Sequence, residues 1–115
     1  KRRELAAPDT CVRVDCLTLW LSNLLFAGQA ATQAEAGVAI DCPLLQGETT
    51  ALIELLPTLP GHIILVSNEV GWGIVPMHPV SRIFADEQGR LNQRVAAVCD
   101  QVTLVAAGLP LKLKG

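Results

Sequence analysis

The stretch IILVSNEVGWGIVP, residues 63–76, decides the fold of this 115-residue chain. Residues 63–66 form an unbroken apolar run, which is typical of a parallel strand buried on both faces in an α/β domain. The loop that follows carries Asn68 and Glu69, and in open α/β sheets ligands bind beyond the carboxyl ends of the strands. We therefore expect Asn68 and Glu69 to line a binding site. The alternative is a turn in which Glu69 caps or pairs locally.

A second strand is expected at residues 11–14, where the sequence CVRV leads into Asp15. An apolar strand closed by an acidic residue has the pattern of a Walker B element, whose carboxylate holds magnesium through water beside the phosphates of a nucleotide. Asp15 also suits the N-cap position of the next helix, because its side chain can accept a hydrogen bond from the first turn. Both interpretations remain open at this point.

Three helices are expected between the strands. Residues 17–26 are apolar almost all round, so this helix should be buried on several sides. Residues 48–56 form an amphipathic helix that is ended by a proline. The third helix begins at Pro79 and has an apolar stripe with the helical period. Gly89 in its interior predicts either close packing or a bend or break.

Two further strands are expected near the end of the sequence. Residues 102–106 form one, and the alternation of leucine with proline or lysine over 109–114 is typical of a half-exposed edge strand. The elements together predict a single α/β domain over residues 1–115, with three parallel strands, a possible edge strand and right-handed crossovers. His62 and His78, at the starts of a strand and a helix, are interpreted as structural residues.

Composition argues against several classes of function. Half of the residues are hydrophobic, 17% are charged and the net charge is −2, so we expect a globular chain with no basic surface for nucleic acid or an anionic membrane. No apolar run approaches the ~18 residues of a membrane-spanning helix. The first ten residues lead into no signal-peptide core, so a cytoplasmic location is expected. The cysteines are too widely spaced for a metal knuckle or a CxxC pair, and we expect reduced core thiols at Cys11, Cys16, Cys42 and Cys99.

Three ordered motifs resemble a known family. VDCLTLWLSNLL at 14–25, VSNEVGWGIVP at 66–76 and SRIFADEQGRLNQRVAAVCDQVTLVAAGLPLKLK at 81–114 are similar to the bifunctional adenosylcobinamide kinase / adenosylcobinamide-phosphate guanylyltransferase of cobalamin biosynthesis. The resemblance covers nearly the whole chain except residues 27–60. It implies an enzyme with a RecA-like P-loop NTPase fold, a mostly parallel sheet flanked by helices, that usually assembles as a homotrimer.

The resemblance also implies an activity and its ligands. Enzymes of this family phosphorylate the aminopropanol hydroxyl of adenosylcobinamide with ATP or GTP. They then transfer GMP from GTP, through a guanylyl-histidine, to give adenosylcobinamide-GDP. Asp15 matches the family's acidic residue near GTP and its magnesium, so it is expected to contact both nucleotide and metal. Asn68 and Glu69 match the polar pair of the NEVG motif and are expected to line the same site.

Two parts of the family's machinery have no match in residues 1–115. These are the glycine-rich phosphate loop, whose backbone N–H groups and lysine hold phosphates, and the guanylylated histidine. Both lie upstream in the family, so this chain is expected to be the C-terminal portion of a longer enzyme, without a catalytic residue of its own and inactive alone. The alternatives are a non-catalytic truncated homologue or oligomerising α/β module, and a nucleotide-binding α/β domain unrelated to cobamides.

Overall fold

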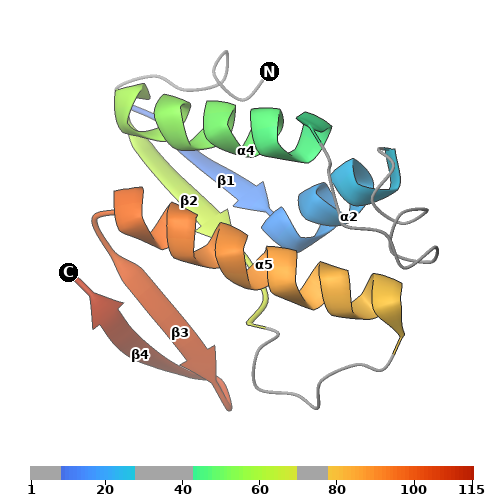
Figure 1. Ribbon diagram of the computed structural model, residues 1–115. Coiled ribbons are helices and arrows are strands. Elements are labelled where there is room, and N and C mark those ends of the chain that lie inside the picture. The colour runs from blue at the N-terminus through green and yellow to red at the C-terminus, as the bar shows by residue number, and fades with distance from the viewer. Residues whose placement is uncertain (1–8, 28–42, 70–77) are drawn as a thin grey trace.

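The computed structural model describes residues 9–27, 43–69 and 78–115, which form a mixed α/β fold (Figure 1). The elements follow in the order β1 (Cys11–Asp15), α2 (Leu17–Ala27), α4 (Pro43–Leu55), the short 3-10 helix η1 (Leu56–Thr58), β2 (His62–Val66), α5 (Pro79–Val98), β3 (Val102–Ala106) and β4 (Leu109–Lys114). Helix α4 starts at Pro43 rather than at Glu48, since a proline suits the first helical turn.

Strands β1 and β2 pair in parallel, as the sequence predicted. Their register runs from Cys11 opposite His62 to Asp15 opposite Val66. The connection between them contains α2 and α4, which is the crossover that two parallel strands require. The carboxyl ends of both strands therefore lie at the same edge of the sheet.

Only one face of the β1–β2 sheet is covered by the described helices. The buried core joins this face to the helices and consists of Val14, Leu17, Leu21, Leu25, Leu45, Leu91 and Val95. On the opposite face Ile64 is 50% exposed, and Arg13 and Val66 are also exposed. The expectation that β2 is buried on both faces is therefore wrong for the described part of the chain, because no described element packs on that second face.

The described residues of α2 bury one side of the helix. Leu17, Leu21 and Leu25, spaced four residues apart, are at most 3% exposed, whereas Leu19 is 60% exposed. The helix contacts α4 and α5, and Figure 1 shows it near the right-hand end of α4 and above the right-hand half of α5. The prediction of a helix was correct. The described neighbours of α2 leave Leu19 open, and burial of that side inside the domain or against another subunit stays a prediction.

Helix α5 is continuous from Pro79 to Val98 despite its internal glycine. A Cβ added to Gly89 would meet nothing within 4 Å. Close packing and a break at this position are therefore both ruled out, while a bend stays a prediction. Gly89 is therefore a weak point of the helix that no contact in the described residues requires.

Strands β3 and β4 form an antiparallel hairpin of their own, which corrects the prediction of a third parallel strand. Ala107 and Gly108 connect them, both with positive φ (53° and 75°), the backbone that a two-residue hairpin turn of the favoured type requires. Because the turn is so short, β3 pairs with β4, the next strand along the chain. Among the described residues, β3 forms no hydrogen bonds with β1 or β2. Lys114 Nζ donates to the carbonyls of Ala96 and Ala97 and so joins the hairpin to the end of α5.

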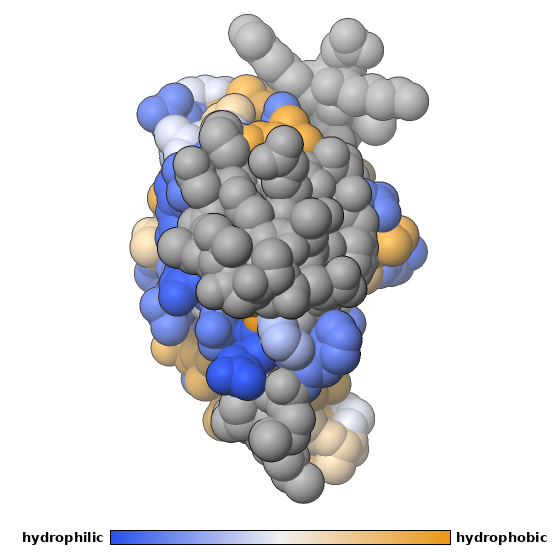
Figure 2. All heavy atoms as spheres, turned by 45° about the vertical axis from the view of Figure 1, so that its right-hand side comes forward, coloured by the Kyte–Doolittle hydropathy of each residue, from blue (hydrophilic) through white to orange (hydrophobic). Residues whose placement is uncertain are grey.

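The surface is mixed in polarity. Figure 2 shows hydrophilic and hydrophobic residues intermixed over this face of the molecule. Among the described residues, no helix has both the length and the apolar character needed to cross a bilayer.

Candidate functional site

The three residues predicted to bind ligand lie at one edge of the β1–β2 sheet. Asp15 is the last residue of β1 and is the register partner of Val66, the last residue of β2. Ser67 follows Val66 along the chain, and Asn68 and Glu69, which are both exposed, come next. The fold therefore brings the carboxylate at the end of β1 and the Asn-Glu pair after β2 to neighbouring strand ends. The remainder of the loop, including Gly71 and Gly73, lies outside the described residues.

Asp15 presents a solvent-facing carboxylate. Its side chain is 54% exposed, and one carboxylate oxygen lies 3.7 Å from a guanidinium nitrogen of Arg13 on the same open face. An exposed ion pair of this kind is weak, and more than half of the Asp15 side chain is open to solvent. The carboxylate is therefore accessible to other ligands. Asp15 is not the N-cap of α2, because the carbonyl of Cys16 accepts the first helical bond, from Trp20 N–H at 3.3 Å.

The backbone of Asn68 is held by side chains from two helices. Its N–H donates to Thr18 Oγ1 on α2 at 3.1 Å, and its carbonyl accepts from Asn92 Nδ2 on α5 at 3.0 Å. The residue just after a strand end would otherwise bond to water. Here the segment that carries Asn68 and Glu69 is attached to both helices that follow the strands.

A polar cluster of Ser67, Gln88 and Asn92 lies behind this segment. Ser67 Oγ donates to Asn92 Oδ1 at 2.5 Å, while Gln88 Nε2 donates to Ser67 Oγ at 2.9 Å and to Asn92 Oδ1 at 3.0 Å. Gln88 is completely buried. The sequence interpretation missed this cluster, although Gln88 and Asn92 stand four residues apart, and Gln88 lies between Phe84 and Leu91 on the apolar stripe of α5. An amide inside that stripe was the pattern that could have revealed it.

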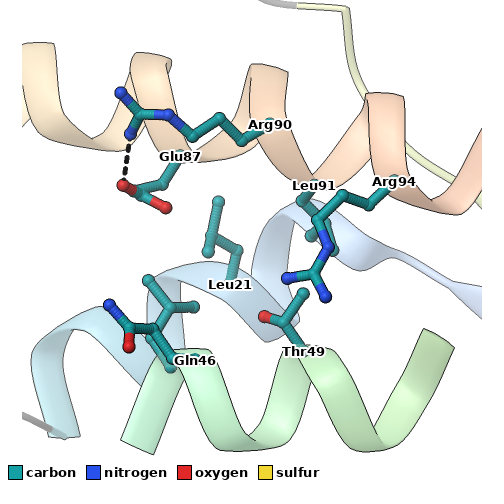
Figure 3. A pocket seen from close by; sticks show the side chains of 8 residues that line it. Leu21, Gln46, Thr49, Glu87, Arg90, Leu91 and Arg94 are labelled. Carbon is teal, nitrogen blue, oxygen red and sulfur yellow. Dashed lines mark hydrogen bonds and ion pairs between the residues drawn. The ribbon is translucent and has the colours of Figure 1, made fainter. Parts of the chain in front are cut away.

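A groove of about 300 Å³ opens among the helices rather than at the strand ends (Figure 3). It is lined by Leu21 of α2, by Leu45, Gln46 and Thr49 of α4, and by Glu87, Arg90, Leu91 and Arg94 of α5. Arg90 is ion-paired with Glu87, and Arg94 reaches Thr50 Oγ1 at 3.5 Å. Both arginines therefore have partners within the protein. None of the lining residues belongs to the strands or to the segment after β2, so the groove is separate from the predicted site.

The histidines and cysteines do not build a second site in the described residues. His62 lies at the amino end of β2, opposite the edge that bears Asn68, and its N–H donates to the carbonyl of Thr10. Cys11, Cys16 and Cys99 are free thiols. The prediction that they lie in the core is wrong for Cys11, which is exposed, while Cys16 and Cys99 are half-buried. Cys42 lies outside the described residues. No group of three or more His, Cys, Asp or Glu side chains within the described ranges could hold a metal ion.

A comparison with protein families gives a match over nearly the whole chain. A family model described as cobinamide kinase / cobinamide phosphate guanyltransferase matches residues 2–113. The chain belongs to this family. The resemblance found in the three sequence motifs is thereby confirmed, and the family match includes both strands and the segment after β2.

Curated relatives of this family are similar over most of the chain. The bifunctional adenosylcobalamin biosynthesis protein CobP of Pseudomonas aeruginosa is 48% identical over 113 residues, which cover 98% of this chain and 58% of that protein. CobU of Salmonella typhimurium is 39% identical over 109 residues, covering 94% and 60%, and CobU of Escherichia coli is 36% identical over 108 residues, covering 93% and 60%. The chain thus spans about three-fifths of the length of each of these relatives.

Proposed function

We propose that this chain is part of an enzyme that phosphorylates adenosylcobinamide and then transfers GMP from GTP to adenosylcobinamide phosphate, giving adenosylcobinamide-GDP in cobalamin biosynthesis. The family match over residues 2–113 is the observation that carries this proposal. The printed names of the relatives, bifunctional adenosylcobalamin biosynthesis proteins, support it. The shared edge of β1 and β2 agrees with it, because ligands of open α/β sheets bind beyond the carboxyl ends of the strands.

In this proposal the nucleotide, ATP or GTP, lies over the edge formed by Asp15, Asn68 and Glu69. Asn68 and Glu69 line the site with an amide and a carboxylate, and Asp15 holds magnesium through water. Magnesium keeps several of its waters and takes few protein carboxylates, so one exposed carboxylate at a strand end suits it. The bound ion would neutralise charge on the phosphates.

The rest of the catalytic machinery is proposed to lie outside residues 1–115. We infer a RecA-like P-loop fold in the intact protein, in which residues 1–115 form a single α/β domain. The glycine-rich phosphate loop and the guanylylated histidine would then be supplied by a further segment. The coverage of three-fifths of the relatives supports this division, since the matched part contains no glycine-rich loop ending in Gly-Lys-Ser.

We also propose that the protein works in the cytoplasm as a homo-oligomer, a trimer by resemblance. Exposed apolar side chains support an assembly, because Leu19 of α2 and Ile64 and Val66 of β2 lie open in the described part of the chain. Apolar surface of this kind commonly marks a protein interface. Light scattering of the full-length protein tests this point directly.

The proposed activity is tested with the full-length protein, magnesium, labelled GTP and adenosylcobinamide. We expect phosphate transfer to adenosylcobinamide and a protein adduct labelled with GMP. Adenosylcobinamide-GDP should form only when both GTP and the corrinoid are present. Absence of both transfers in a folded protein that binds magnesium and GTP would refute the proposed function.

A second candidate is a non-catalytic module that assembles with copies of itself. The exposed leucines of β4 and the open face of β2 favour it, because they leave apolar surface for a partner. This candidate predicts an oligomer in light scattering together with no GMP labelling. The labelling experiment therefore separates the two candidates.

A further inference from the structure

The polar cluster behind Asn68 sets the orientation of one side chain. Asn92 Oδ1 accepts hydrogen bonds from Ser67 Oγ and Gln88 Nε2. With both donors on the oxygen, the amide nitrogen of Asn92 is directed at the carbonyl of Asn68, where it donates at 3.0 Å. The cluster therefore determines which end of the Asn92 amide meets the segment after β2.

Stability alone is a poor explanation for this cluster. Gln88 is 0% exposed, and its Oε1 has no hydrogen-bond partner among the described residues. A buried acceptor without a partner is unfavourable, and an apolar residue of similar size would fill the same space without that cost. An amide kept in the apolar stripe of α5 under such conditions is better explained by what it positions than by what it stabilises.

We propose that Thr18 and Asn92, with Gln88 behind Asn92, are positioning residues that fix the Asn68 backbone so that the side chains of Asn68 and Glu69 are presented to the nucleotide. The inference rests on the proposed function, because that function assigns the nucleotide to this edge. Thr18 holds the N–H of Asn68 from α2, and Asn92 holds its carbonyl from α5. A ligand-binding segment fixed in this way loses less conformational freedom when the ligand binds.

Two substitutions remove the two bonds separately. Asn92→Asp keeps an oxygen for Ser67 and Gln88 but places a second oxygen where Nδ2 donates to the Asn68 carbonyl. Thr18→Val keeps the side-chain shape and removes the acceptor of the Asn68 N–H. Asn23→Asp on α2 and Thr103→Val on β3 make the same chemical changes at exposed positions and serve as matched controls.

The experiment measures hydrogen exchange of the Asn68 amide and steady-state kinetics with GTP, both in the full-length protein. We expect exchange to become about fivefold faster in each variant, the factor that matches loss of one ordinary hydrogen bond. KM for the nucleotide should rise by a similar factor with a smaller change in kcat, and the controls should change neither. A merely structural role would not confine faster exchange to residues 67–69.

Three outcomes separate the possible failures. Exchange at Asn68 no faster in Asn92→Asp and Thr18→Val than in the controls would show that these side chains do not hold the backbone. Faster exchange with an unchanged KM would overturn the positioning role. If the unsubstituted protein transfers neither phosphate nor GMP, the proposed function fails, and the exchange rates still decide whether Thr18 and Asn92 hold the segment.

Discussion

Replacing Leu21 by alanine tests how the helices of this fold are held together. Leu21 is 1% exposed in the middle of α2 and belongs to the core that joins the helices to β1. The substitution removes three buried carbon atoms, which at about 0.8 kcal/mol each correspond to about 2.4 kcal/mol. Leu21 also lines the groove of Figure 3, so the space left behind joins an opening rather than becoming a closed cavity. The additional cavity cost should therefore be small.

We expect Leu21→Ala to lower the free energy of unfolding by about 2–3 kcal/mol. Leu19→Ala on the same helix is the matched control, since Leu19 is 60% exposed and its loss should change the stability by less than about 0.5 kcal/mol. Urea unfolding followed by far-UV circular dichroism, with the combined fluorescence of Trp20 and Trp72 as a second probe, measures both. Equal losses for the two variants would refute the assignment of the buried side of α2.

Two further predictions concern α5 and its end. Gly89→Ala should raise the free energy of unfolding by about 0.5–1 kcal/mol in the same urea assay, because the added Cβ meets nothing within 4 Å; a decrease would mean that the glycine is required there. Burial raises the pKa of the Cys99 thiol, an effect that the charge of Lys114 opposes and that of Asp100 increases. The folded state therefore holds this proton more tightly than the unfolded state, so the stability from this group is complete below the ordinary pKa of a thiol and is lost as the pH rises above it. Unfolding curves at several alkaline pH values should show this decline in the unsubstituted protein and a flatter profile in Cys99→Ala; identical profiles would contradict it.

The sequence predicted the elements better than their surroundings. Both strands of the parallel sheet were predicted, at residues 63–66 and at the sequence CVRV, and they pair in parallel as expected. A strand can be predicted from the pattern of its own residues. Burial depends on what packs against a strand, and Ile64 lies open where burial on both faces was predicted. The same reason explains Leu19, whose exposure depends on the positions of α4 and α5 rather than on the apolar character of α2.

The sequence patterns also could not predict which strand pairs with β3, or the polar cluster behind Asn68. The run 102–106 suits a parallel or an antiparallel strand equally well. The short turn at Ala107 and Gly108 makes β3 pair with β4 as an antiparallel hairpin. For the site, the sequence pattern alone placed Asp15, Asn68 and Glu69 at or just beyond the carboxyl ends of strands. Thr18 and Asn92 are distant in sequence from Asn68, and only the packing of α2 and α5 brings them to it.

Asp15→Asn in the full-length protein tests the central claim, that the shared edge of β1 and β2 binds a magnesium–nucleotide complex. The variant removes a charge from an exposed strand end, so the fold should persist, with Asp100→Asn at an exposed position as its matched control. Magnesium titrations of phosphate and GMP transfer are the measurement. We predict that the magnesium concentration for half-maximal transfer rises by about 10–100-fold in Asp15→Asn and stays constant in the control. Unchanged magnesium dependence and unchanged transfer rates in a folded Asp15→Asn variant would contradict the claim.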